Sequence, residues 1–289
     1  MSNEQLLVTL KQEYRKLRLY VLLMLLLLVA ALVFVFVNRI VSLVLIGACA
    51  VFYIFVFRRE QQRYADSITE ANLSCTVAKT LGTKQILPKS GGTITKDTIE
   101  HAAMMPVKEI DGSPLLCWGM NGSLNNLPVS VCDATIAQDF SLQEKGKKRV
   151  HFNAGAWVHV ELPEDTNQRW CLLDETSVPT PIRMDYFSHK MNMQTASVGN
   201  DIIGKKCVLY QPAEKERQLS SQLLHEIQKL IEYTPGYVAI SVKGNCVDFF
   251  LRGRFLSRAV SISQAPTKEL LEFDPFPELK YLLKIAKAI

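Results

Sequence analysis

Two long apolar runs near the N-terminus dominate the pattern of this chain. Residues 19–37 and 40–57 carry no charged side chain, and only Asn38 and Arg39 separate them. Each run has about the length that an α-helix needs to cross a hydrocarbon core of roughly 30 Å. One helix through both runs would leave Arg39 near the middle of the hydrocarbon, which is costly. The pattern therefore predicts two transmembrane helices over residues 19–57, and it disfavours a buried hairpin, which the remaining residues could hardly enclose.

The charges on either side of the apolar runs predict an orientation. Basic residues lie before the first run and directly after the second, whereas the turn carries only Arg39: Lys11, Arg15, Lys16, Arg18, Arg58, Arg59 and Arg63. Basic flanks stay on the cytoplasmic side. We therefore expect a multi-pass protein of the cell inner (cytoplasmic) membrane with both termini in the cytoplasm, in which residues 1–18 form a basic interfacial lead.

Helical spacing continues after the second run and then gives way to strand patterns. Residues 58–105 predict a helical stalk and connector, including a short helix capped by Thr95 or Asp97. Strands are expected at 114–118 and 127–135 around a turn at 119–123, and at 150–160 with 168–173 pairing back. Residues 106–289 thus read as one cytoplasmic α+β domain.

Residues 207–289 show the clearest pattern of apolar and polar positions. Residues 212–233 predict a helix that begins at Pro212, and 237–242 and 246–251 predict a β-hairpin closed by Lys243-Gly244-Asn245. A terminal helix is expected over 277–289. The poorly periodic residues 179–200 are interpreted as a loop that links two halves, 106–178 and 198–289. The predicted fold class is α+β, with a transmembrane helical hairpin followed by an antiparallel sheet with packed helices.

Net charge and cysteine usage argue against several classes of function. The 289 residues carry a net charge of +5, which suits an anionic cytoplasmic leaflet and is too small to indicate nucleic-acid binding. The seven cysteines are an odd number without a C-x-x-C pair. That usage favours reduced thiols in a reducing compartment over a disulfide framework or a zinc site.

Three blocks of this layout resemble a known family. They are LPKSGGTITKDTIEHAAMMP (87–106), RVHFNAGAWVHVELP (149–163) and the segment from Val208 to Leu251. The layout is similar to bacterial membrane-anchored proteins with two N-terminal transmembrane helices and a cytoplasmic domain of unknown function. The resemblance implies a shared α+β domain, and it implies no activity, cofactor or catalytic residue.

The sequence lacks the motifs of common active sites. H-E-x-x-H, G-x-S-x-G and the phosphate-binding G-x-x-x-x-G-K-[ST] are all missing. His151 and His159 share one face of a predicted strand but lie about 26 Å apart along it, too far to share an ion. We therefore predict no catalytic, metal or cofactor-binding residues. Basic side chains are the candidates for contact with lipid headgroups or a partner: Lys145, Lys147, Lys148, Arg149, Arg252 and Arg254.

These observations favour a membrane-tethered binding, scaffold or regulatory protein. Its expected partners are the bilayer, through two spans, and a protein of unknown identity; assembly into a homo-oligomer is left open, and nucleic acid is not expected. The alternative is an enzyme whose site is assembled from residues distant in sequence, such as a thiol hydrolase that uses one cysteine and one histidine.

Overall fold

The computed structural model describes residues 3–107, 112–139, 150–174, 180–215, 217–234, 236–257 and 264–289. The chain divides into two compact units. The first contains residues up to 76 together with residues 264–274 of the C-terminal part. The second contains residues 77–257 and 275–289. Each unit is described separately below.

The first unit is built on a long helical hairpin. Helix α1 (Asn3–Val37) is followed by α2 (Arg39–Phe52), a short π-helical stretch η1 (Tyr53–Phe57) and α3 (Arg58–Cys75). Asn38 caps α2, since its side-chain oxygen accepts hydrogen bonds from the backbone N–H of Ile40 and Val41 at 3.0 and 3.4 Å. The hairpin turn therefore forms at the polar break that the sequence predicts.

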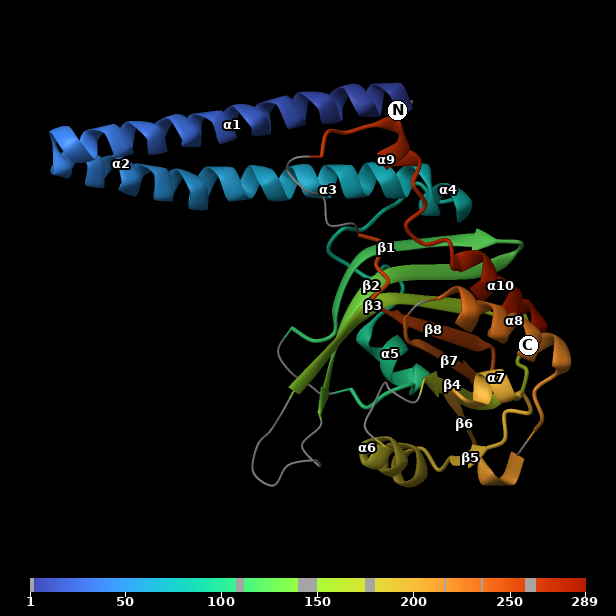
Figure 1. Cartoon of the computed structure of the whole chain (residues 1–289). Helices are drawn as coiled ribbons and strands as arrows, with labels where there is room; N and C mark the ends of the chain where they lie inside the picture. Colours follow the sequence, from blue (N-terminus) through green and yellow to red (C-terminus); the bar gives the residue numbers. More distant parts are fainter. Residues whose placement is uncertain are drawn as a thin grey trace. The chain divides into compact units, whose positions relative to one another are not determined.

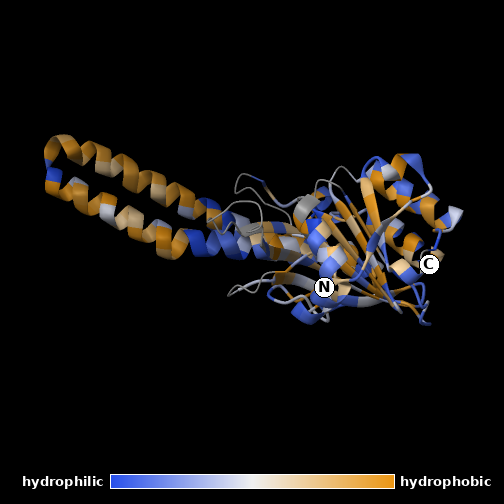
Figure 2. Ribbon diagram, turned by 90° about the horizontal axis from the view of Figure 1, so that it is seen from below, coloured by the Kyte–Doolittle hydropathy of each residue, from blue (hydrophilic) through white to orange (hydrophobic). Residues whose placement is uncertain are grey.

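The hairpin presents apolar side chains to its surroundings. α1 and the helical segment that follows Asn38 are each long and apolar enough to cross a membrane. Leu19 is 64% exposed and Phe36 is 89% exposed. Figure 2 shows the two helices as almost continuous hydrophobic ribbon, interrupted by hydrophilic residues at the turn and beyond the apolar runs. Between the helices, the Ser42 hydroxyl donates to the Ala31 carbonyl at 2.8 Å.

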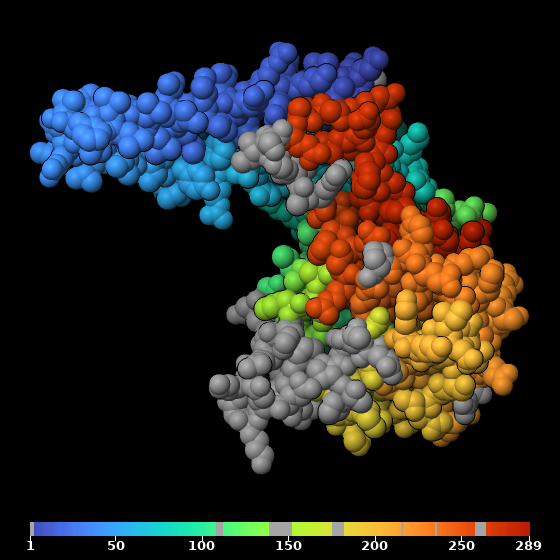
Figure 3. Space-filling view, in the orientation of Figure 1, coloured from blue at the N-terminus to red at the C-terminus, as the bar shows by residue number. Residues whose placement is uncertain are grey.

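A C-terminal segment completes the first unit. Helix α9 (Lys268–Glu272) packs Leu270 and Leu271 against Tyr64, Ile68 and neighbouring residues of α3. In Figure 3 the red atoms of this C-terminal segment lie against the helices of the hairpin. The buried Asn72 amide donates to the carbonyls of Leu270, Leu271 and Phe273 at 3.0, 3.1 and 2.7 Å. These carbonyls lie at the C-terminal end of α9, so Asn72 satisfies groups that the helix itself leaves without partners.

The second unit is an antiparallel sheet with helices on both faces (Figure 1). In the described residues the sheet has eight strands in the order β1-β2-β3-β8-β7-β4-β6-β5. Their bounds are β1 Leu115–Leu124, β2 Leu127–Asp139, β3 Val150–Glu161, β4 Arg169–Asp174, β5 Gln194–Ala196, β6 Cys207–Gln211, β7 Val238–Lys243 and β8 Cys246–Arg252. The helices are α4 Val77–Thr80, α5 Lys96–Ala102, α6 Thr180–Asp185, η3 Tyr186–Lys190, α7 Asp201–Gly204, η4 Ala213–Lys215, α8 Ser221–Tyr233 and α10 Leu279–Ala288. This confirms the α+β class and the antiparallel sheet.

Alternation along the strands makes two apolar faces. One face contributes Cys132, Trp157 and Phe250 to a cluster that includes Ile99 of α5 and Phe187 of η3. The other face carries the alternate positions of the same strands. The amphipathic helices α8 and α10 bury their own apolar stripes outside that cluster and cover this second face (Figure 1). The core is therefore layered as helix, sheet and helix.

Close strand approach explains one glycine. A side-chain carbon added to Gly155 on β3 would stand 2.1 Å from the backbone oxygen of Leu251 on β8. No side chain fits in that space, so the pairing of β3 with β8 requires glycine at this position.

One predicted turn and one predicted strand pairing are wrong. Residues 119–123 belong to strand β1, and the hairpin between β1 and β2 turns at Asn125 and Asn126 instead. Both asparagines have φ near +60°, the left-handed region that asparagine tolerates better than most residues. Strand β4 does not pair back on β3, because it lies between β7 and β6.

Two further predictions in the C-terminal half are wrong as well. The segment 179–200 is not a plain loop, since it contains α6, η3 and β5 and buries Phe187 and Met193 in the core. The helix expected from Pro212 begins only at Ser221, where Ser220 caps it by accepting from the N–H of Leu223 at 3.2 Å. The hairpin at 243–245, the terminal helix and the Thr95 cap are confirmed.

Candidate functional site

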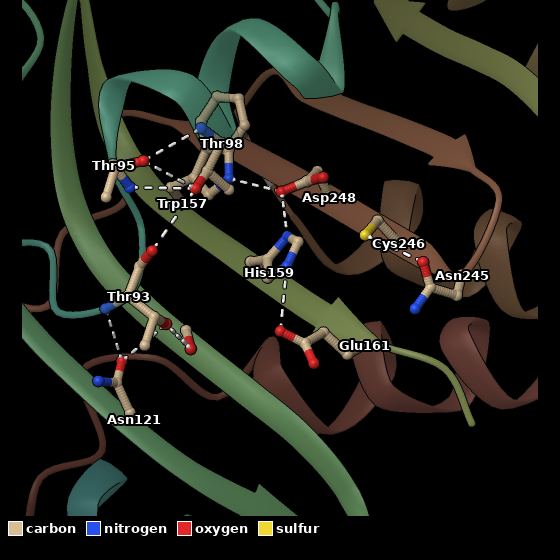
Figure 4. Close-up of polar contacts among 11 residues, drawn as sticks. Thr93, Thr95, Thr98, Asn121, Trp157, His159, Glu161, Asn245, Cys246 and Asp248 are labelled. Atoms are coloured by element: carbon tan, nitrogen blue, oxygen red, sulfur yellow. Dashed lines mark hydrogen bonds and ion pairs between the residues drawn. The ribbon is translucent and has the colours of Figure 1, made fainter. Parts of the chain in front are cut away.

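The pairing of β3 with β8 gathers polar side chains on one face of the sheet. Trp157, His159 and Glu161 alternate along β3, so all three point to the face that α5 covers. The antiparallel register sets His159 opposite Asp248 and Glu161 opposite Cys246. Figure 4 shows these side chains converging near the end of the two strands. We call His159, Asp248, Trp157 and Glu161 the histidine cluster.

Asp248 organises the histidine cluster. One of its carboxylate oxygens accepts from the indole N–H of Trp157 at 2.9 Å and lies 2.8 Å from Nδ1 of His159. The Asp248 side chain is 3% exposed, and that of His159 is 13% exposed. A buried carboxylate with two such partners holds the imidazole ring in one orientation and fixes which nitrogen faces it. The other nitrogen, Nε2, lies 3.9 Å from the exposed carboxylate of Glu161.

These contacts control the charge of the imidazole. Burial by itself lowers the pKa of His159, but the hydrogen bond and charge of Asp248, together with the charge of Glu161, outweigh it. The net result is a raised pKa. A proton is therefore held on His159 at a pH where a free histidine would have begun to lose it.

A second histidine nearby is shifted in the opposite direction. The Nζ of Lys243 on β7 lies 3.3 Å from Nδ1 of His101 on α5. Burial first, and then the positive charge of Lys243, lower the pKa of His101. Burial and the charge of Arg169 likewise lower the pKa of Lys243. One face thus holds one histidine that favours the cationic form and one that favours the neutral form, a contrast typical of acid–base sites.

The nearest predicted strand cysteine is not activated. Burial raises the pKa of Cys246, and the negative charges of Asp248 and Glu161 add to the effect. Its thiol lies 3.5 Å from the side-chain oxygen of Asn245. The thiol therefore stays protonated and is a weak nucleophile. Within the part of the chain that the structure describes, no group of three or more His, Cys, Asp or Glu residues could hold a metal ion.

A neighbouring hydroxyl network has a structural role. Asn121 of β1 accepts from both the backbone N–H and the hydroxyl of Thr93 at 3.1 Å, and Thr93 also contacts the hydroxyl of Ser130 at 2.6 Å. Thr95 and Thr98 cap α5 reciprocally (Figure 4). These contacts attach the glycine-containing loop before α5 to the sheet and so position the helix that covers the histidine cluster.

The predicted basic residues fall in different places. Lys145, Lys147, Lys148 and Arg149 lie outside the described residues. Arg252, at the end of β8, is exposed. Arg254 is one-third exposed and pairs with Glu278, whose side chain is fully buried. The Nε to Oε1 distance is 2.6 Å, but neither atom makes an aligned hydrogen bond. We therefore treat the contact as an ion pair that neutralises a buried carboxylate.

Sequence reasoning missed the histidine cluster. It placed Trp157 and His159 on one strand face, which the structure bears out. It did not connect them with Asp248, since Trp157 and Asp248 are 91 residues apart and are joined only by the β3–β8 register. The available signal was a lone aspartate among apolar residues of the predicted strand 246–251, a position where a buried partner is to be expected.

Comparisons of the chain with protein-family models, with curated proteins and with solved structures found no match. The resemblance to membrane-anchored bacterial proteins therefore stays a prediction, and the site is argued from its geometry alone.

The raised pKa of His159 predicts a pH-dependent stability. The protonated imidazole gains the Asp248 contact only in the folded chain. Its contribution is therefore complete below the usual pKa of 6.5 and is lost as the pH rises through the folded pKa. Each pH unit between the two values is worth about 1.4 kcal/mol. NMR titration of the imidazole and urea unfolding across this pH range, in detergent, measure both quantities.

The Asp248→Asn variant should bring the His159 pKa down and flatten that pH dependence. His225→Asn removes an exposed histidine of α8 and serves as the matched control. An unchanged His159 titration in Asp248→Asn would contradict the assignment.

The two arginines of the predicted set should behave differently. Arg254→Ala leaves the Glu278 carboxylate buried without its counter-charge, so we expect a loss of about 2–3 kcal/mol, reduced from the range for fully buried pairs because Arg254 is partly exposed. Arg252→Ala should change the free energy of unfolding by less than about 0.5 kcal/mol. Urea unfolding of both variants in detergent makes the comparison, and equal losses would refute it.

Proposed function

We propose that this protein is anchored in the cell inner membrane by a helical hairpin and that its α+β unit acts in the cytoplasm as a binding or regulatory module. The observation that carries the proposal is the exposed apolar surface of α1 and α2. Apolar side chains from Leu19 to Val51 project outward from both helices. Such a surface in water would be a strong driver of aggregation, whereas a hydrocarbon core accommodates it.

Charge around the hairpin supports the orientation. The polar part of the hairpin, where α1 and α3 run together, carries Lys16 and Arg63 around Glu60, with Lys16 and Glu60 paired at 3.1 Å. The hairpin turn carries a single arginine, Arg39. The positive-inside bias places the polar end, and with it both termini, on the cytoplasmic side.

Exposed basic side chains remain our candidates for partner contact. Arg252 is exposed at the end of β8, and Phe255, three residues later, is 40% exposed. Arginine and aromatic residues are both enriched where proteins bind one another. We propose an acidic protein surface as the partner of this region.

The alternative function, a thiol hydrolase, draws support from the oriented His159–Asp248 pair. A hydrolase of that kind also needs a thiolate within reach of the imidazole. Burial and nearby carboxylates raise the pKa of Cys246, and burial raises the pKa of Cys117 to about 11 and holds that of Cys171 above its usual value. We favour the binding function for this reason.

Membrane insertion can be measured directly. We expect the full chain to stay in the membrane pellet after an alkaline carbonate wash and to enter the supernatant only with detergent. In intact cells, an impermeant maleimide should label an Arg39→Cys variant at the hairpin turn, whereas Cys75 at the end of α3 should react only after permeabilisation. Release by carbonate, or labelling of the wild-type chain in intact cells, would overturn the proposal.

Partner contact through Arg252 predicts a salt-sensitive interaction. Crosslinking in isolated membranes should yield an adduct with the wild-type chain that weakens with rising ionic strength, because exposed charges are screened. Arg252→Ala should lose most of the adduct, and Arg217→Ala, another exposed arginine of the same unit, should keep it. Equal yields from both variants would remove Arg252 from the interface.

A further inference from the structure

A cleft at one end of the sheet lies apart from the histidine cluster. It has a volume of about 490 Å³, within the range of small-molecule sites. Its apolar wall includes Ile231 and Val238, which are 5% and 4% exposed. These residues come from the end of α8 and the start of β7, so the cleft sits on two rigid elements of the second unit.

Charged groups of both signs line the same cleft. Lys205 and Lys206 follow α7, are exposed, and have no ion-pair partner among the residues that the structure describes. Asp174 at the end of β4 and Glu232 near the end of α8 supply two carboxylates. The C-terminal carbonyls of α8 add partial negative charge on the Glu232 side. The lysines and carboxylates that line the cleft among the described residues therefore balance in charge, and the carboxylates belong to different elements from the lysines.

One buried hydroxyl at this cleft has no hydrogen-bond partner among the described residues. Thr234, at the end of α8, lines the cleft and is 4% exposed. Its Oγ1 atom is buried and has no hydrogen-bond partner in the described residues. Buried hydroxyls in native proteins nearly always have a partner, so this unpaired one behind the wall of the cleft would gain a hydrogen bond by turning toward a ligand atom.

We propose that the cleft binds a small zwitterion, a molecule that carries an ammonium group and a carboxylate or phosphate group on a short apolar frame. The anionic group meets Lys205 and Lys206, and the ammonium group meets Asp174, Glu232 and the end of α8. The Thr234 side chain turns from its buried position toward the cleft, so that its hydroxyl donates to a ligand oxygen, and the apolar frame lies against Ile231 and Val238.

A ligand with a single charge fits this lining less well. A simple anion would satisfy the lysines but would approach two carboxylates and a helix C-terminus, and a simple cation would meet two ammonium groups. A ligand with both charges satisfies both sets. The inference does not rest on membrane insertion, because binding is measured on the detergent-solubilised chain whichever way the hairpin is placed.

Binding of four matched pairs of ligand and analogue tests the proposal. The probes are L-leucine and phosphoethanolamine, each compared with its anion-only analogue, 4-methylpentanoate or ethyl phosphate, and its cation-only analogue, 3-methylbutylamine or ethylamine. Titration calorimetry on the full chain in a non-ionic detergent should show at least one zwitterion binding roughly tenfold tighter than both of its analogues. The preferred zwitterion identifies whether a carboxylate or a phosphate is recognised.

Variants decide whether that binding occurs in this cleft. The Lys205→Ala/Lys206→Ala chain should bind roughly tenfold more weakly or worse, and Thr234→Val, which keeps the side-chain shape, should bind about three- to tenfold more weakly. Lys79→Ala/Lys84→Ala changes two exposed lysines of the same unit and should bind as the wild type does. Absence of any preference for the zwitterions, or equal affinity of the two double variants, would overturn the proposal.

Discussion

The antiparallel pairing of β3 with β8 is the contact on which the second unit depends. It joins the meander β1-β2-β3 to the strands β7, β4, β6 and β5, so that segments far apart in sequence share one sheet. Gly155 permits the close approach, because a side chain there would meet the backbone of Leu251. Without this pairing, the amphipathic helices on the two faces would have no continuous apolar surface to cover.

The same pairing sets the chemistry of the unit. It places His159 opposite Asp248. Because side chains alternate between the two faces of a strand, Trp157 and Glu161, two residues before and two residues after His159 on β3, lie on the same face. A carboxylate that is 3% exposed is tolerated there because an indole N–H and an imidazole both contact it. The contacts of Asp248 therefore raise the pKa of His159, while burial and the charge of Lys243 lower the pKa of His101.

The first unit differs from the second in where its apolar side chains lie. A local signal, the Asn38 cap, forms its turn, and one long-range contact, the amide of Asn72 at the end of α9, holds its C-terminal segment. Along α1 and α2 the apolar side chains face outward, the reverse of the arrangement in the sheet unit. Such a pattern suits a solvent that is itself apolar, which is why membrane insertion is the central proposal for this part of the chain.

Local patterns in the sequence determined the helical hairpin and its turn, the Thr95 cap, the 243–245 hairpin and the terminal helix, because capping, turn chemistry and periodicity act within a few residues. They also placed Trp157 and His159 on one strand face. Only the tertiary structure decided that β4 lies between β7 and β6, that Phe187 and Met193 pack in the core, that Asp248 faces His159 and that Arg254 neutralises Glu278. Each of these depends on register between strands or contacts between elements distant in the chain, and no short-range pattern specifies such pairings.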